Sequence, residues 1–417
     1  MTPRPVVLVV ELSILLLCAS EVSAVKRRSF VTSVEGTGDL FSWAGSSGAT
    51  ALARGDSICR ARATAAGLPN AATYRAWLST STTDAYCHVQ GLTGLRSTGC
   101  GGAPLPGGGP WYQVNGVTQF SADLETLTGS ERVVYRQVLF DEFANAITDS
   151  FAGAYWTGSN PTGSASSAHC ANWTSNASAS SGCSGTSVAG SYSWSYWFWR
   201  GCSSQQRLLC LEPGESEATA VAWQPGSLTF ATSEKGSGEL SSWPHAGSAT
   251  GLAAGDAICR NLAGEAHLPD PDSFTAWLSD AVTDAVDRLT GNGPYRRLDG
   301  FVVANNKAGL ASGGTLNSIH VDELFTYLGD NGYTRTGTGA DGLGTGEHCL
   351  TWSSADPSDQ AAAGYATISR DAAWTNFGYG QECASPARIY CFSNRVTLFW
   401  DGFDSTGDTG RWSSTVP

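Results

Sequence analysis

The pattern of apolar and polar residues predicts a helix followed closely by a short strand. Over residues 50–67, apolar side chains recur at helical spacing, with Leu52, Ile58 and Ala63 on one side. Residues 74–78 then alternate as a strand with one buried face does. The chain is therefore expected to form α+β units in which a helix packs against a sheet.

The same pattern returns 200 positions later. Residues 30–43 match residues 230–243 at Phe, Thr, Ser, Gly, Leu and Trp positions, and the match continues without a gap to Asp84 and Asp284. Units of a solenoid are roughly 20–50 residues long, so a period of this length indicates a duplicated domain.

These repeats predict the domain organisation. Each half closes with an apolar strand that carries its last cysteine, Arg207–Leu211 and Arg388–Phe392. A segment rich in Pro, Gly and acidic residues separates the halves and is expected to let them move. The expected division is a first domain at 27–212, a linker at 213–228, a second domain at 229–393 and a C-terminal tail at 394–417.

The first 24 residues are typical of a signal peptide. Arg4 precedes an apolar run at 6–19, and Val22-Ser23-Ala24 suits cleavage after Ala24. An uncleaved anchor or a lipoprotein site at Cys18 are the alternatives. We expect a secreted or cell-surface protein whose mature form has no membrane span. The tail could serve in sorting or attachment, although a surface strand with a loose end explains it more simply.

The net charge and the composition limit the classes of binding partner that are expected. The 417 residues carry a formal net charge of −13, with a pI near 4.8. Such a chain is expected not to bind nucleic acid, heparin-like polyanions or anionic membranes. Fifty glycines, 15 tryptophans and a single methionine favour a loop-rich extracellular protein.

Cysteines are expected to form disulfides, because the chain is predicted to be exported and contains no Cys-x-x-Cys pair. Four cysteines in each half occupy equivalent positions, and their spacing alone allows three connectivities. The first half adds Cys87 and Cys100 within a Gly-rich insertion, which predicts a local bridge. Cys183 is left over, and we expect a free thiol rather than an intermolecular link. The equivalent sets are Cys59, Cys170, Cys202 and Cys210, and Cys259, Cys349, Cys383 and Cys391.

Several segments resemble one family. The helix-Cys stretch followed by Tyr-Arg-Ala-Trp-Leu-Ser at 74–79, the segments 155–163 and 169–173, and the closing strand 388–392 are similar to endostatin. They also look like uncharacterised bacterial secreted domains of the C-type-lectin-like fold. The resemblance implies two tandem α+β domains of that fold, with mixed, mostly antiparallel sheets, flanking helices and disulfide staples. A shared fold of this kind does not define a function.

This resemblance also implies a nested disulfide pattern. The first cysteine of each half would pair with the fourth, and the second with the third: Cys59–Cys210, Cys170–Cys202, Cys259–Cys391 and Cys349–Cys383. Other family properties are not expected here. The chain is acidic where endostatin is basic, the mature start has no histidine for a zinc site, and the calcium motifs of sugar-binding lectins are missing.

Catalytic and metal-binding signals are weak. His169 and His348 occupy equivalent positions and could be ligands or bases, but a role in the fold explains them as well. No nucleophile elbow or zinc-protease helix is present in the sequence. No cofactor is expected, although calcium at Asp341, Glu347 or Asp356 is conceivable, because calcium prefers clustered carboxylate and carbonyl oxygens.

The run Tyr192–Trp199 has more aromatic residues than a buried strand needs. The second half offers only Trp374, Phe377 and Tyr379 at the corresponding place. Flat aromatic faces stack on sugar rings or on apolar partners. The candidate ligand-binding residues are Trp194, Tyr196, Trp197 and Trp199. The alternative is a strand packed on both faces.

The leading expectation is a non-enzymatic binding protein that recognises an extracellular glycan or a surface protein. A structural or adhesive protein without a specific pocket is the first alternative. A secreted polysaccharide hydrolase is the second, and it would need a pair of carboxylates across a cleft. The sequence leaves the oligomeric state open.

Overall fold

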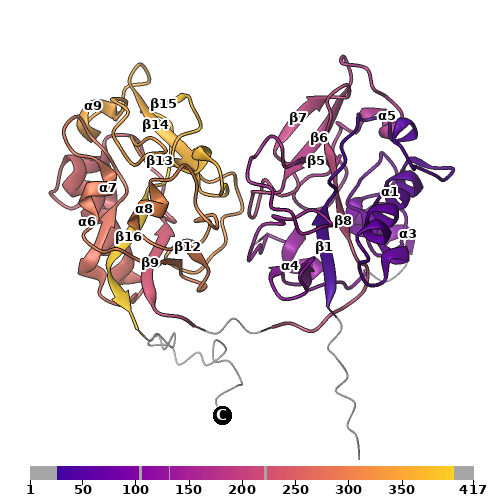
Figure 1. The fold of residues 1–417 in the computed structure, drawn as a ribbon. Helices are drawn as coiled ribbons and strands as arrows, with labels where there is room; N and C mark the ends of the chain where they lie inside the picture. Colours follow the sequence, from indigo (N-terminus) through magenta and orange to yellow (C-terminus); the bar gives the residue numbers. More distant parts are fainter. Residues whose placement is uncertain (1–25, 103–105, 131, 220–222, 399–417) are drawn as a thin grey trace, which may run out of the picture.

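The computed structural model describes residues 26–102, 106–130, 132–219 and 223–398. The predicted signal peptide, Cys18 and all of the tail beyond Leu398 lie outside these residues. The two halves of the chain form two bodies that lie side by side (Figure 1). No helix within the described residues is long and apolar enough to span a membrane.

The first half is built on one sheet in the order β4-β3-β1-β8-β5-β6-β7, with β2 also paired to β8. The pairs β1–β3 and β5–β8 are parallel, and the other pairs are antiparallel. The strands are β1 (Arg27–Val31), β2 (Arg75–Ala76), β3 (Trp111–Gln113), β4 (Gln119–Ser121), β5 (Ala154–Trp156), β6 (Ser181–Thr186), β7 (Phe198–Gly201) and β8 (Arg207–Leu211). The helices are α1 (Ala51–Ala65), α2 (Ala85–His88), α3 (Gly99–Gly102), α4 (Leu124–Thr128) and α5 (Cys170–Trp173).

The second half repeats this plan in two sheets, ordered β10-β16-β9-β11-β12 and β13-β14-β15. Its strands are β9 (Gly226–Ala231), β10 (Phe274–Ala276), β11 (Tyr295–Arg297), β12 (Val302–Ala304), β13 (Tyr333–Arg335), β14 (Gln360–Tyr365), β15 (Gly380–Glu382) and β16 (Tyr390–Thr397). Its helices are α6 (Gly251–Glu265), α7 (Ala285–Arg288), α8 (Lys307–Leu310) and α9 (Cys349–Trp352). The predicted α+β class with mostly antiparallel sheets is confirmed.

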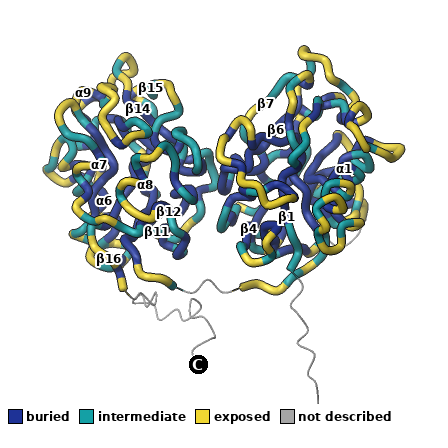
Figure 2. The backbone as a smooth tube through the Cα atoms, in the orientation of Figure 1, coloured by how far each residue is buried: buried dark blue, intermediate teal, exposed yellow. Residues whose placement is uncertain are grey.

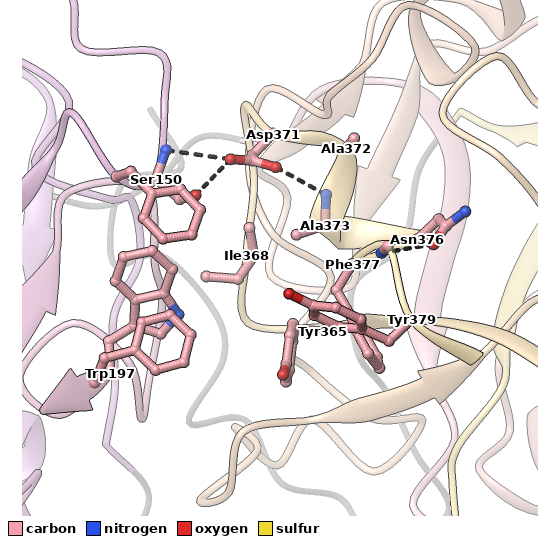
Figure 3. Close-up of a pocket in the computed structure, with 13 residues that line it drawn as sticks. Ser150, Trp197, Tyr365, Ile368, Asp371, Ala372, Ala373, Asn376, Phe377 and Tyr379 are labelled. Carbon is pink, nitrogen blue, oxygen red and sulfur yellow. Dashed lines mark hydrogen bonds between the residues drawn. The ribbon is translucent and has the colours of Figure 1, made fainter. Parts of the chain in front are cut away.

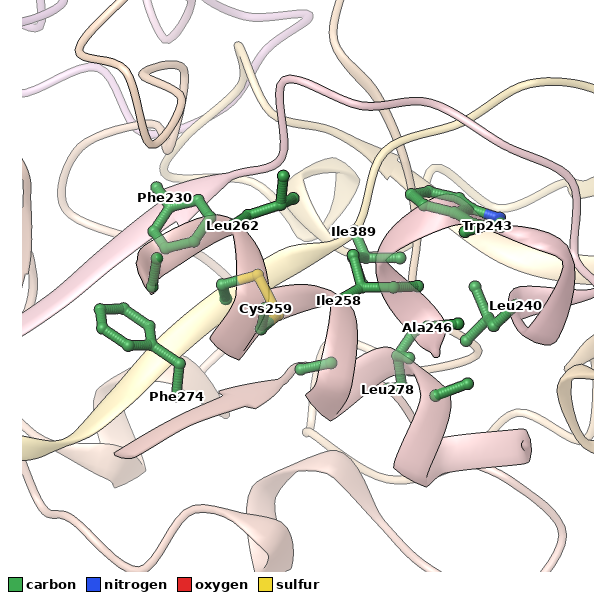
Figure 4. Packing of buried hydrophobic residues seen from close by; sticks show 14 of the residues in the cluster. Phe230, Leu240, Trp243, Ala246, Ile258, Cys259, Leu262, Phe274, Leu278 and Ile389 are labelled. Carbon is green, nitrogen blue, oxygen red and sulfur yellow. A yellow bond between two sulfur atoms is a disulfide. The ribbon is translucent and has the colours of Figure 1, made fainter. Parts of the chain in front are cut away.

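The first long helix of each half packs against the sheet, as the apolar spacing predicts. Helix α1 begins after Thr50, whose Oγ1 accepts a hydrogen bond from the Ala53 amide (3.2 Å), and ends before Gly67, where φ is +65°. In the second half, Ile258 and Leu262 of α6 face Phe230, Phe274 and Ile389 (Figure 4). Buried residues occupy the interior of each half (Figure 2).

Five disulfides staple this fold. The four nested pairs implied by the resemblance are present, and Cys87–Cys100 closes the insertion. Cys59–Cys210 and Cys259–Cys391 tie the long helix of each half to its closing strand. Cys183 is a free, buried thiol, as predicted. Burial raises its pKa to about 12, so little of it is thiolate at neutral pH.

An unusual turn follows the equivalent histidines. In α5 the four residues Cys170–Trp173 all have left-handed φ values, from +48° to +64°, and α9 repeats this conformation. The Nδ1 of His169 accepts a hydrogen bond from the Asn172 amide, and the Nδ1 of His348 accepts one from the Thr351 amide. Both histidines therefore cap a strained turn, which favours their role in the fold.

The segment between the halves is less free than its composition predicts. Ser216 donates a backbone hydrogen bond to Gly109 (2.9 Å), and the Glu217 carbonyl accepts hydrogen bonds from Lys26 and from the Tyr112 hydroxyl. At the other end, β16 continues through Thr397 and pairs with Gly226. The predicted linker and tail are thus partly built into the two bodies.

The two halves contact each other through equivalent segments. Residues 188–190 follow β6, and residues 367–369 follow β14 at the same distance. The Gly190 amide donates to the Thr367 carbonyl (2.6 Å), and the Ser369 amide donates to the Val188 carbonyl (3.0 Å). These reciprocal bonds flank the antiparallel bridge between Ala189 and Ile368, which are both buried. The contact is therefore isologous, like that of a two-fold symmetric dimer.

Candidate ligand site between the two halves

The aromatic run of the first half is not one continuous strand. Residues 191–195 form turns, and β7 begins at Phe198. Trp194 is 1% exposed and packs between Trp77 and Phe120, with ring centroids 4.9 and 5.9 Å away. The prediction that Trp194 belongs to a binding surface is wrong, because the turn directs it into the core.

The residues that follow Trp194 reach the surface. Trp197 packs against Phe198 (centroids 4.3 Å apart) and against Phe151 (5.1 Å). Phe151 and Phe198 are 60% and 39% exposed. Trp199 is 55% exposed but projects from the opposite face of β7, and Tyr196 packs edge-on against Tyr192. Of the four predicted residues, Trp197 alone belongs to the cluster described next.

The second half presents aromatic rings opposite this cluster. Tyr365 packs on Phe377 with centroids 4.9 Å apart, and Tyr379 continues the row at 6.0 Å from Phe377 and is 75% exposed. Phe377 is the counterpart of Trp197, because their amides donate to the equivalent carbonyls of Ala363 and Ser184. The pseudo-two-fold contact thus brings corresponding aromatic positions toward one another.

Between the two groups lies a cavity of about 340 Å³. Figure 3 shows Trp197 on one side, Tyr365, Phe377 and Tyr379 on the other, and Ile368 between them. This volume lies at the lower end of the range for small-molecule sites, roughly 300–1,000 Å³. A mostly apolar lining with a few polar groups is also typical of such sites.

Most polar groups of the cavity already form hydrogen bonds with other groups of the protein. One carboxylate oxygen of Asp371 accepts from the amide and hydroxyl of Ser150 across the interface (3.2 and 2.5 Å), and the other accepts from the Ala373 amide (2.9 Å). The Asn376 Oδ1 accepts from the Gly378 amide, while its Nδ2 has no hydrogen bond among the described residues. Asn376 therefore has a donor available for a ligand.

The carboxylate content of the cavity lining bears on the hydrolase alternative. Asp371 is the single carboxylate among the described residues that line the cavity, and it is already hydrogen-bonded. A glycosidase of the usual kind needs two carboxyl groups on opposite sides of the scissile bond. The cavity offers a positioned apolar surface without that pair.

The conceivable calcium ligands are not assembled into a metal site. The Asp341 Oδ1 accepts from the Leu343 amide in a local turn, and Asp356 accepts from the Ser358 amide and hydroxyl. Glu347 is exposed. Within the described residues, no group of three or more His, Cys, Asp or Glu side chains is placed to hold a metal ion.

A second hollow lies in the first half beside α1. Its volume is about 420 Å³, and threonine side chains and the exposed ring of Phe41 dominate its lining. It lacks the facing aromatic rows of the cavity between the halves, so it provides a weaker basis for recognition.

Several cavity residues carry little signal in the sequence. Phe151, Ser150 and Asp371 lie outside any repeated or aromatic-rich motif, and Tyr365 ends an alanine-rich strand. Phe377 and Tyr379 are noticeable in the sequence only as the smaller aromatic set of the second half. Their role depends on the contact between the halves, which no local pattern specifies.

Comparisons with known proteins do not assign the chain to a family. No protein-family model matches the chain, and no curated protein matches it.

Proposed function

We propose that this is an extracellular, non-enzymatic binding protein that holds a glycan in the cavity between its two halves. The observation that carries the proposal is the convergence of Phe151, Trp197 and Phe198 on Tyr365, Phe377 and Tyr379 around a cavity of ligand size. Exposed aromatic rings on both sides offer flat faces for a sugar ring, and Asn376 supplies a donor for a hydroxyl.

The environment and fold that we infer agree with this role. Five disulfides are typical of proteins outside the cytoplasm. The motifs similar to endostatin and to C-type-lectin-like domains support a lectin-like fold for each half. We propose that binding needs no calcium, because the aromatic rings and amide donors supply the contacts.

The proposal is tested with a glycan array and two tryptophan variants. Trp197→Ala removes a ring of the cavity, whereas Trp199→Ala removes a ring of equal size from the opposite face of β7 and serves as the matched control. We expect Trp197→Ala to lower retention about five- to 150-fold, taking as a guide the stacking of a nucleic-acid base on an aromatic side chain, which contributes about 1–3 kcal/mol. Trp199→Ala should bind like the parent.

Three results would overturn the proposal or part of it. Equal loss in both variants would place the ligand elsewhere, and retention that disappears with chelator would show a calcium site. A blank array would favour a structural or adhesive role. Circular dichroism and thermal unfolding establish that each variant is folded before binding is compared.

A further inference from the structure

Arg200 lies against the aromatic cluster that the first half contributes to the cavity. Its guanidinium carbon is 4.9 Å from the ring centroid of Phe151, 5.4 Å from that of Phe198 and 5.8 Å from that of Trp197. Arg200 is two residues after Phe198 in β7, so both side chains project from the same face of the strand. The positive charge is thus held at the rings that would receive the ligand.

Among the described residues, this guanidinium has no anionic partner. The structure places no carboxylate in an ion pair with Arg200, and no side-chain hydrogen bond satisfies it among the described residues. Its Nε is buried without an acceptor, and burial lowers the pKa of the side chain. This partly buried side chain keeps an unsatisfied donor beside a ligand-sized cavity, where an acceptor on the ligand would satisfy it.

Arg132 and Arg136 also have a buried Nε without an acceptor, but they lie over Tyr192 and Phe301, which are not among the residues that line the cavity. Two other cationic side chains near the interface have partners. Arg297 pairs with Asp299, and Arg370 donates to the Leu316 carbonyl. The position opposite Ala361 in the second half, which corresponds to Arg200 opposite Gly182, is occupied by Gln381. Of these two equivalent positions, only the one in the first half carries a charge; it lies against the rings of Phe151 and Phe198, next to the cavity lining rather than within it, and it defines an orientation for a bound molecule.

Resting on the function proposed above, we infer that the preferred ligand is a carboxylate-bearing sugar, such as a uronic acid residue. Its ring stacks on Trp197 and its neighbours, and its carboxylate accepts hydrogen bonds from the Arg200 guanidinium. The planar fork of arginine suits a carboxylate, which can accept two parallel N–H bonds.

The acidity of the whole chain restricts this ligand further. At a net charge of −13, a polyanion meets repulsion from most of the surface. A single carboxylate that lies within a few ångströms of Arg200 gains a short-range contact that distant charges, screened by salt, scarcely affect. We therefore expect selection for a sugar with one acidic group over heavily sulfated chains.

The test measures the affinity of the full mature chain for two matched disaccharides, one ending in glucuronic acid and the other in glucose. Arg200→Gln removes the charge and keeps much of the length, while Arg395→Gln removes the same charge from an exposed position on β16. We expect the parent to prefer the acidic disaccharide, and Arg200→Gln to lose about tenfold or more in affinity for it. Affinity for the neutral disaccharide should fall much less, so that the preference for the acidic one is lost, and Arg395→Gln should behave like the parent.

The outcomes separate this inference from the proposed function. If the parent binds both disaccharides equally, or Arg200→Gln keeps the acidic preference, the inference is wrong, while a loss of neutral binding in Trp197→Ala still supports the glycan cavity. If neither disaccharide binds the parent, both the inference and the cavity's role in glycan binding are wrong. Arg200→Lys adds a further check: the charge without the fork should restore only part of the preference.

Discussion

His320 is a buried histidine whose protonation opposes the contact between the halves. Its Nε2 donates to the Val134 carbonyl of the other half (2.8 Å), and its Nδ1 accepts from the Ser318 hydroxyl (2.6 Å). Burial, and then the nearby charge of Arg297, hold its pKa well below the ordinary 6.5. Neutral His320 is therefore the form that the folded protein requires.

The sign of the pH effect follows from this depressed pKa. The unfolded state takes up a proton near pH 6.5 and the folded state does not, so stability present above pH 6.5 is lost as the pH falls. Between pH 6.5 and 5.5 the loss amounts to about 1.4 kcal/mol at most. Leu139 occupies the equivalent position of the first half, so His320→Leu should lack this loss: between pH 6.5 and 5.5 its free energy of unfolding in urea should fall less than that of the parent.

Asp322, two residues after His320, has the opposite effect on stability, so its contribution must be separated from that of the histidine. Burial raises the pKa of Asp322 to about 6, so the folded state gains protons, and stability, as the pH falls from 6 toward 3.8. Because Asp322 is present in both proteins, the difference between parent and His320→Leu isolates the histidine. Identical pH profiles for the two would contradict the assignment.

The aromatic residues show how well the sequence predicts whether an individual side chain is buried. Trp77 and Trp277 occur in both copies and are buried, as their repetition predicts. Trp194 and Trp197 lie three residues apart in one run, yet the first is core and the second lines the cavity. The turns at 191–195 decide this difference, and their geometry depends on contacts far away in the chain.

At the scale of elements, the two long helices offer a matched test of capping. Thr50 caps α1 through its hydroxyl, whereas Thr250 precedes α6 without such a bond. Thr50→Ala should lower the free energy of unfolding by about 0.5–2 kcal/mol, and Thr250→Ala should cost much less. Urea unfolding followed by circular dichroism measures both, and equal losses would contradict a specific role for the Thr50 hydroxyl.

Local signals define these helices well but miss the left-handed turns. The start of α1 near Thr50 and its stop before Gly67 can be predicted, because apolar spacing and cap residues act within a few positions. Four successive left-handed residues at Cys170–Trp173 are not predictable in this way. Each would cost about 1–2 kcal/mol in isolation. A distant disulfide to Cys202 and the burial of Trp173 hold the turn in place.

At the scale of the whole molecule, the decisive feature is the pairing of the two halves. The duplication is evident in the sequence, but the surfaces that meet are not. Val188 and Ala189 correspond to Thr367 and Ile368, and these pairs differ in residue type. Gln137 donates to Ser318 (2.6 Å), and these residues stand at equivalent places four positions before Asp141 and Asp322. Such contacts depend on how well the folded surfaces of the two halves fit together, and the repeated motifs do not specify that fit.

This pairing makes the cavity a preformed site, which a cross-link can test. Ala189 and Ile368 form a non-hydrogen-bonded antiparallel pair, for which Cα atoms lie about 4.5 Å apart, within the range that a disulfide spans. The double variant Ala189→Cys with Ile368→Cys should form a bond between the halves, detected by non-reducing peptide mapping, while in either single variant the introduced cysteine should remain a free thiol, as Cys183 does in every form.

If the halves are already paired in solution, the cross-link changes little else. The radius of gyration from small-angle X-ray scattering should match that of the parent, and the affinity for glycan should stay within about twofold, since no ordering cost remains to be removed. A parent that is measurably larger than the cross-linked form, together with tighter binding after cross-linking, would show instead that ligand must bring the halves together. In that case the aromatic rows would still form the site, but the contact at Ala189 and Ile368 would be the step that binding drives.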